Sequence, residues 1–214
     1  MIGRNRARGL TRRQLASRAA LGTAALAVGI PADRALADAA MPKPPLLGSD
    51  KATKRFVCWG TYTCPFTAQL FQMLLGIVRE NPGFAAVEWR HFPTHPVDPA
   101  LHVAALAFEG DNFWKFSFAM MALVLKNGGM YDQLTPAKLI EFAEAAGGSE
   151  EILNKAYADD AKWTAVNQDM LAGRLMGVSL TPGLFFNGYF LRPEGIPNDK
   201  AAFDQSLRAM LKVG

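Results

Sequence analysis

The feature that most constrains the fold is residues 56–71, where an apolar run, a short loop and a Cys-Pro pair follow one another. Residues 56–59 are continuously apolar, which is typical of a strand buried on both faces of a sheet. Pro65 suits the first turn of a helix, because a backbone N–H has no partner there. Cys64 is therefore predicted at a helix N-terminus, where unpaired N–H groups and the helix dipole favour the reactive thiolate.

The first 37 residues have the order of charged, apolar and small residues expected of an export signal. Residues 1–18 contain six arginines and no acid, residues 19–30 are apolar, and Ala35-Leu36-Ala37 offers a cleavage site. Arg12-Arg13 favours the twin-arginine route. We therefore expect residues 1–37 to be a signal and the protein to be periplasmic or otherwise exported. A basic tail and an uncleaved anchor are the alternatives.

The charge of the chain depends strongly on this signal. The whole sequence has 23 basic and 19 acidic residues, a net charge of +4. Seven arginines and one aspartate lie in residues 1–37, which leaves 16 basic and 18 acidic residues. This balance favours no nucleic-acid partner. No later segment has 18 uninterrupted apolar residues, so we expect no membrane association after signal removal.

One strand–helix–strand unit follows an extended, proline-containing leader at residues 38–54. The apolar residues of Pro65–Glu80 recur at helical spacing, and Asn81-Pro82-Gly83 ends that helix. A second strand is predicted at residues 87–92. Two strands joined in this way form a parallel pair with a right-handed crossover.

Beyond the second strand the pattern is mainly helical, apart from one hairpin. Asn187-Gly188, between apolar residues, predicts the turn of a hairpin at residues 184–191. The helices are predicted at residues 98–109, 112–126, 136–146, 150–158, 161–176 and 200–212.

Four motifs at these positions resemble a known family. They are Thr61-Tyr-Thr-Cys64-Pro65, Arg90-His-Phe-Pro93, Phe113-Trp114 and Gly177-Val-Ser-Leu-Thr181-Pro182-Gly-Leu-Phe-Phe-Asn187-Gly188. Together with the order of the elements, they resemble the DsbA-like thiol:disulfide oxidoreductases. The resemblance implies an α/β, thioredoxin-like fold over residues 55–214, with an inserted α-helical domain at about residues 98–177.

The resemblance also assigns roles around Cys64. In the family, a cis-proline lies against the active-site cysteine, and the backbone before it pairs with an extended substrate. These roles fall on Pro182 and Thr181, and we expect Pro65 and Phe66 to contact the same substrate. The implied partners are cysteine-containing exported proteins or peptides, and neither a metal nor a bound cofactor is implied.

Thr67 departs from the family pattern, because most active members have a cysteine at this position. In a dithiol enzyme, that second cysteine resolves the mixed disulfide formed by the first. Cys64 can still attack a disulfide, and the hydroxyl of Thr67 can donate a hydrogen bond to its sulfur. Release of Cys64 then requires a partner reductase or a low-molecular-weight thiol, such as glutathione acting as co-substrate. We therefore expect monothiol exchange, isomerisation or reduction rather than dithiol oxidation.

Two other functions are compatible with these residues. A redox-silent peptide-binding or chaperone module would keep the substrate groove and lose the second cysteine. A glutathione-dependent transferase or isomerase on a related fold would use Cys64 in a different reaction. A peroxiredoxin is disfavoured, because Val57 stands where that signature has a proline.

The second cysteine and the histidines suggest further chemistry, which we consider weaker. Cys58 lies in the first strand, which favours a small buried side chain over a resolving thiol. A Cys58–Cys64 bridge would require the intervening chain to double back. His91, His95 and His102 suggest a copper site with Cys64. Their spacing matches no tight ligand pair, so we expect surface or strand-end histidines.

The insertion is rich in aromatic residues and methionine, which we expect to form its core rather than a substrate groove. These residues are Phe108, Phe113, Trp114, Phe116, Phe118, Met120, Met121 and Met130. Asp98, Glu109 and Asp111 are expected at helix caps or on solvated faces.

Overall fold

A computed structural model describes residues 43–192 and 199–212, and the expected export signal lies outside them. A five-stranded sheet with the order β1-β3-β2-β4-β5 forms the centre of this part of the chain. β2 and β3 run parallel, and the other neighbouring strands are antiparallel. The strands are β1 (Leu46–Gly48), β2 (Lys54–Gly60), β3 (Ala85–His91), β4 (Gly183–Phe186) and β5 (Tyr189–Leu191).

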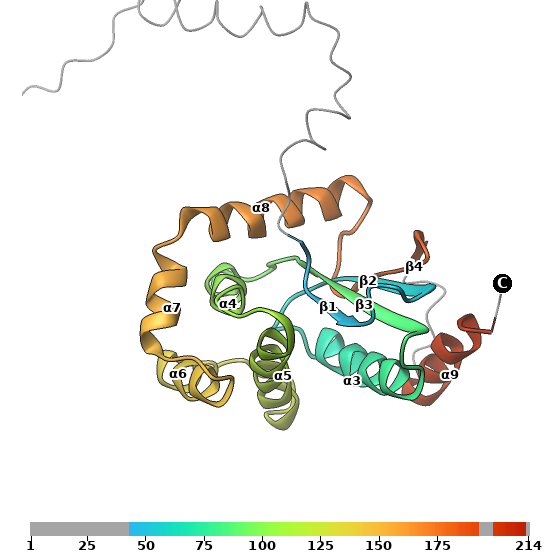
Figure 1. The fold of residues 1–214 in the computed structure, drawn as a ribbon, viewed down its shortest axis with the longest axis horizontal. Helices are drawn as coiled ribbons and strands as arrows, with labels where there is room; N and C mark the ends of the chain where they lie inside the picture. The colour runs from blue at the N-terminus through green and yellow to red at the C-terminus, as the bar shows by residue number, and fades with distance from the viewer. Residues whose placement is uncertain (1–42, 193–198, 213–214) are drawn as a thin grey trace, which may run out of the picture. The chain divides into compact units, whose positions relative to one another are not determined.

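Helices cover both faces of the sheet (Figure 1). α3 (Pro65–Glu80) and α9 (Lys200–Met210) lie on one face, where Phe56 and Cys58 of β2 belong to the main core. α8 (Asp160–Leu175) crosses the other face, where Trp59 of β2 packs in a second, smaller cluster. β2 is thus buried on both sides, as its continuous apolar sequence predicts.

Five consecutive helices separate β3 from β4 and form the expected inserted domain. They are α4 (Asp98–Ala105), α5 (Gly110–Lys126), α6 (Pro136–Ala145), α7 (Glu150–Tyr157) and α8. The predicted aromatic core is confirmed, because Phe113, Trp114 and Phe116 are buried in the cluster that also contains the sheet and α3. Insertion and sheet therefore share one core, with Phe71 of α3 stacked on Trp114 at 5.7 Å.

Two expectations about these regions are wrong. Met130, expected in the core, is 62% exposed in the loop after α5, although Met120 and Met121 are buried. The extended leader was expected to precede the domain, but Leu46–Gly48 forms the edge strand β1. β1 is held by two contacts. It pairs with β3, and Trp114 Nε1 of α5 donates a hydrogen bond to the Leu46 carbonyl at 3.0 Å.

The predicted hairpin is confirmed, with its turn at Asn187-Gly188 between β4 and β5. Both turn residues have positive φ, 46° and 86°, as a two-residue hairpin turn of type I′ requires. The Asn187 side chain accepts a hydrogen bond from the Arg55 N–H at 2.9 Å, which ties the turn to β2. Among the residues described, no helix is both long and apolar enough to cross a membrane.

The contact between α8 and the sheet depends on a glycine. A Cβ atom on Gly173 would lie 2.6 Å from Trp59 Cδ1 and 3.0 Å from Phe92 Cδ2. Gly173→Ala should therefore lower the free energy of unfolding by about 1–3 kcal/mol, in spite of alanine's higher helix propensity. Urea denaturation measures this difference.

Gly76→Ala is the matched control for that substitution. Gly76 is also helical, and its nearest neighbour would lie 3.7 Å from an added Cβ. The higher helix propensity of alanine should raise the stability of this variant by up to about 1 kcal/mol. Equal stabilities of the two variants would contradict the close packing of α8 on Trp59.

Candidate active site

The candidate active site is centred on Cys64, which caps the N-terminus of α3 in an extended conformation with φ −89° and ψ 117°. Its thiol donates a hydrogen bond to the Thr181 carbonyl, with an Sγ–O distance of 3.3 Å. The Thr181-Pro182 peptide bond is cis. Two motifs that lie 117 residues apart in the sequence thus meet at Cys64, a residue that is 9% exposed.

The first turn of α3 supplies the groups that would stabilise a thiolate. Because a helix leaves its first N–H groups without partners, the amides that follow Cys64 and the helix dipole favour negative charge on the sulfur. Pro65 occupies the first helical position, as predicted, and α3 has the predicted bounds Pro65–Glu80. Phe66, two residues after Cys64, projects into solvent with 67% of its surface exposed.

Thr67 lies one turn after Cys64 and is completely buried. Its methyl group packs closely under Gly60, where an added Cβ would lie 2.6 Å from Thr67 Cγ2. The Thr67 hydroxyl has no hydrogen-bond partner among the described residues. The hydrogen bond from Thr67 to Cys64, which the sequence suggested, is therefore not formed in this structure, where the thiol is bonded to Thr181 instead.

Cys58 is confirmed as a buried side chain of the main core, and both cysteines are free. It lies in β2 opposite Trp89 of β3 and Leu184 of β4. Burial, and to a smaller extent the nearby Cys64, raise the pKa of the Cys58 thiol far above its ordinary range. Cys58 is therefore a poor nucleophile, which leaves Cys64 as the candidate reactive thiol.

Three consecutive side chains before Cys64 are tied to the helical insertion, and we call them the Thr61–Thr63 anchor. Thr61 Oγ1 is 3.3 Å from His102 Nε2 in α4, and the Tyr62 hydroxyl is 3.0 Å from Ser117 Oγ in α5. All four of these side chains are fully buried. Because the anchor leads directly into Cys64, the insertion fixes the position of the thiol.

Asp98 forms the third contact of the anchor, through a Thr63 hydroxyl that donates to Asp98 Oδ1 at 2.7 Å. Its other oxygen accepts hydrogen bonds from the N–H groups of Thr94 and His95, both at 2.7 Å. Asp98 was expected at a cap or on a solvated face, and the solvated alternative is wrong because the residue is fully buried. The sequence has no signal for this network, since Thr63 and Asp98 are 35 residues apart.

The expectation of surface or strand-end histidines holds for His95 and fails for His102. His95 is exposed beside Thr63, with 3.0 Å between its Nδ1 and Thr63 Oγ1. His91 ends β3 but is buried, and its Nδ1 lies 2.8 Å from Nδ1 of the buried His102. Within the described residues, no group of three His, Cys, Asp or Glu side chains could hold a metal ion.

The two buried imidazoles are held in the neutral form. Burial lowers the pKa of His91 well below its ordinary value, with smaller contributions from His102 and Arg90. Burial also lowers the pKa of His102, to about 3. The geometry agrees, because two imidazolium rings would direct N–H groups at each other across the 2.8 Å contact between their Nδ1 atoms.

A buried carboxylate joins α8 to the edge of the site. Asp169 Oδ1 accepts from Arg90 Nη1 and Oδ2 accepts from the His91 N–H, both at 3.0 Å. The Asp169 carbonyl accepts from Trp59 Nε1, also at 3.0 Å. Burial raises the pKa of Asp169, and the bonds to His91 and Arg90 act in the opposite direction. These contacts fix the helix that leads into the Thr181-Pro182 loop.

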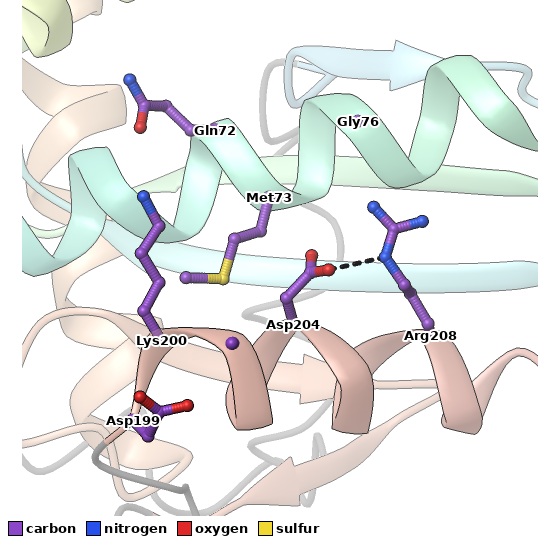
Figure 2. Close-up of a pocket in the computed structure, with 8 residues that line it drawn as sticks. Gln72, Met73, Gly76, Asp199, Lys200, Asp204 and Arg208 are labelled. Atoms are coloured by element: carbon purple, nitrogen blue, oxygen red, sulfur yellow. Dashed lines mark hydrogen bonds and ion pairs between the residues drawn. The ribbon is translucent and has the colours of Figure 1, made fainter.

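A separate pocket of about 520 Å³ lies between α3 and α9, away from the thiol. Figure 2 shows Lys200 extending from α9 toward Gln72 of α3, and the ion pair between Asp204 and Arg208 beside it. Arg208 also pairs with Glu80 of α3. Cys64 does not line this pocket, so we do not assign it to the active site.

Cys64 follows the central strand β2, begins α3 and lies against the Thr181-Pro182 loop with its cis peptide bond. This arrangement defines a thiol protein with the thioredoxin fold. The family model described as thioredoxin matches residues 40–207. The chain therefore belongs to the thioredoxin family. Because this match covers most of the chain, it includes both the sheet and the helical insertion.

Solved structures with the same fold include thioredoxin-like and thiol-disulfide exchange proteins of low sequence identity. A thioredoxin-like oxidoreductase from Silicibacter pomeroyi DSS-3 is 18% identical with a TM-score of 0.64, covering 86% of this chain and 99% of that one. A periplasmic thioredoxin-like protein from Salmonella enterica serovar Typhimurium is 22% identical with a TM-score of 0.64, covering 80% and 89%. The thiol-disulfide exchange protein alpha-DsbA2 from Wolbachia pipientis is 17% identical with a TM-score of 0.60, covering 78% and 87%.

A curated relative resembles the chain over part of its own length only. The Na(+)/H(+) antiporter NhaA 3 of Salinispora tropica is 28% identical over 145 residues, or 66% of this chain. The match covers 21% of the antiporter, so the chain spans about a fifth of that relative.

The buried histidine pair makes stability dependent on pH. Each ring has a lower pKa in the folded state than in the unfolded chain, so the unfolded state binds the proton first as the pH falls. The contribution of each neutral histidine to the free energy of unfolding is complete above about pH 6.5 and decreases toward pH 3. Between pH 7.5 and pH 5.0, each histidine should lower the free energy of unfolding by about 2 kcal/mol.

His102→Gln isolates one of these two contributions. Urea unfolding at the two pH values should show a pH-dependent loss of stability that is smaller in the variant than in the wild type by about 2 kcal/mol. The absolute stability of the variant does not enter this comparison. An identical pH dependence in both proteins would contradict a neutral, buried His102.

Proposed function

We propose that the protein is an exported thiol:disulfide exchange protein that acts through Cys64 alone. The observation that carries this proposal is the position of Cys64, at the N-terminus of α3 and 3.3 Å from the carbonyl of Thr181. Export is supported by the basic, apolar and small-residue order of residues 1–37 and by the periplasmic Salmonella protein of the same fold. Suitable substrates are cysteine-containing exported proteins or peptides.

The reaction begins with attack of the Cys64 thiolate on a substrate disulfide. A new S–S bond forms between Cys64 and one substrate sulfur, and the electron pair of the broken bond leaves on the other substrate sulfur as a thiolate. The amides of the first turn of α3 stabilise the attacking thiolate before this step. Substrate binding displaces the Cys64 thiol from Thr181, whose backbone then becomes available to the substrate chain.

Resolution of the mixed disulfide requires a thiol from outside the chain. Thr67 carries no thiol, and Cys58 is buried in the core with a raised pKa. An incoming thiolate attacks the substrate sulfur, and Cys64 leaves as a thiolate. Such a cycle supports isomerisation, reduction or deglutathionylation, in which the mixed disulfide persists until a second thiol arrives.

Exposed apolar side chains around the thiol favour a polypeptide substrate. Phe66 follows the Cys-Pro pair, and Leu180 directly precedes Thr181 with 66% of its surface exposed. Met130 lies next to Gly129, where an added Cβ would contact Pro65 at 3.3 Å. An extended peptide paired with Thr181 would place its neighbouring side chains over these residues.

The same surface supports a second candidate function, a redox-silent peptide-binding module. The complete burial of Thr67 at the position of a resolving cysteine is the observation that favours it. This module would bind peptides through Phe66 and Leu180 with equal affinity in the wild type and in Cys64→Ser. Binding that disappears with the thiol would exclude it.

Exchange activity should depend on Cys64 and be independent of Cys58. We expect Cys58→Ser to reduce an uncharged dipyridyl disulfide at a rate within about threefold of the wild type, because Cys58 is buried and protonated. Cys64→Ser should show no rate above that of buffer. The release of pyridinethione measures both rates, and equal rates in the two variants would overturn the assignment of Cys64.

Thr67→Cys tests whether the absence of a resolving thiol determines the chemistry. A cysteine one turn from Cys64 has an effective concentration in the millimolar range or above, so it should resolve the mixed disulfide without an external thiol. We expect the Cys64 mixed disulfide, trapped by acid quench and detected by mass spectrometry, to have a lifetime at least tenfold shorter in this variant than in the wild type.

Thr67→Val is the matched control, because it has the same shape without hydroxyl or thiol. Its mixed disulfide should persist as in the wild type. Its free energy of unfolding should rise by about 1 kcal/mol, since the buried Thr67 hydroxyl has no partner among the described residues. A short lifetime in Thr67→Val, or a long one in Thr67→Cys, would contradict the proposed role of this position.

A further inference from the structure

A groove beside the Thr181-Pro182 loop has not been assigned a role above. It has a volume of about 610 Å³, within the range of small-molecule sites. Its residues come from the loop after β3 and from the end of α8 and the loop that follows: Phe92, Pro93, Thr94, Arg174, Gly177, Val178 and Ser179. We call it the Arg174 groove.

Both walls of the Arg174 groove are connected to Cys64 through short paths. On one wall, the Thr94 N–H donates to Asp98, which accepts from Thr63, the residue before Cys64. On the other wall, Ser179 is two residues before Thr181, whose carbonyl accepts from the Cys64 thiol. Cys64 does not line the groove, but each wall belongs to a segment that also contacts Cys64 or the residue before it.

Arg174 gives the groove a positive charge that no carboxylate of the described residues neutralises. It lies in the last turn of α8 and is exposed, and no carboxylate pairs with it among residues 43–192 and 199–212. Arg90 and Arg208, by contrast, each pair with two carboxylates. A guanidinium presents two parallel N–H donors, which suit a carboxylate.

The other surfaces of the groove suit a small peptide-like molecule. Phe92 and Val178 are buried beneath it and provide an apolar floor. The hydroxyl-bearing Thr94 and Ser179 are exposed on opposite walls. Gly177, with φ 88°, leaves open space where a side chain would otherwise stand, because an added Cβ would meet nothing within 4 Å.

We propose that the Arg174 groove binds a carboxylate of a low-molecular-weight thiol of the glutathione class and brings its sulfur to the mixed disulfide on Cys64. This inference rests on the proposed monothiol function and identifies the class of thiol that completes the cycle. The incoming thiolate forms an S–S bond with the substrate sulfur. The Cys64–substrate bond breaks, its electron pair leaves on Cys64, and the number of disulfides is unchanged.

The test compares glutathione with its dimethyl ester, which has the same thiol and no free carboxylate. The full chain carrying Cys58→Ser is first converted to a mixed disulfide between Cys64 and 2-mercaptoethanol, an uncharged group. Mass spectrometry then follows the return of free Cys64 with each thiol. We expect glutathione to be about twofold to fivefold faster than the ester in this protein, the size of one solvent-exposed ion pair.

Arg174→Gln should remove this preference, and Arg174→Lys should restore part of it. Arg79→Gln is the matched control, because Arg79 is also exposed in the last turn of a helix but does not line the groove. It should keep the full preference. Equal rates for glutathione and the ester in the Cys58→Ser protein that retains both arginines would overturn the inference. An equal loss of the rate preference in Arg174→Gln and Arg79→Gln would also overturn it.

The outcomes also separate this inference from the proposed function. If Cys64 forms and releases mixed disulfides at rates that do not depend on the charge of the thiol, only the proposed role of the Arg174 groove is overturned. If no thiol or disulfide reacts with Cys64, the proposed function fails, and the inference fails with it.

Discussion

The position of the active-site thiol depends on the Thr61–Thr63 anchor. β2 ends at Gly60, and the next three side chains each make a buried hydrogen bond to a helix of the insertion. The chain therefore enters α3 from a segment that is held on every residue, and Cys64 meets the Thr181 carbonyl from this fixed direction. A thioredoxin-fold sheet alone would supply the strand and the helix, but none of these three contacts.

The chemistry follows from what surrounds the thiol on the helix side and on the loop side. Cys64 lies at the N-terminus of α3 and donates to the Thr181 carbonyl, and the neighbouring Thr67 contributes neither a second thiol nor a hydrogen bond. The strand-borne Cys58 is removed from the reaction by burial. In the proposed cycle, Cys64 provides the attack and an external thiol provides the resolution, so the nature of that thiol would determine the direction of exchange.

Local sequence signals predicted the elements well, because each was determined by residues close in the chain. The Cys-Pro pair and Asn81-Pro82-Gly83 bound α3 correctly, and Asn187-Gly188 specified the hairpin turn. β1 was missed because three residues of an edge strand carry little periodicity. The Asp98 network and the His91–His102 contact were also missed, since they join residues that only the folded chain brings together.

The Thr61–Thr63 anchor has a consequence for attempts to transplant this active site. Moving residues 61–67 into a thioredoxin without the insertion would transfer the anchor and the Cys-Pro-Phe-Thr sequence, but not the helices that the anchor contacts. Thr61, Tyr62 and Thr63 would then present two hydroxyls and a phenol to an environment with no matching acceptors. The smallest portable unit is therefore the Cys64 loop together with α4 and α5, which makes the insertion part of the candidate site rather than an accessory to it.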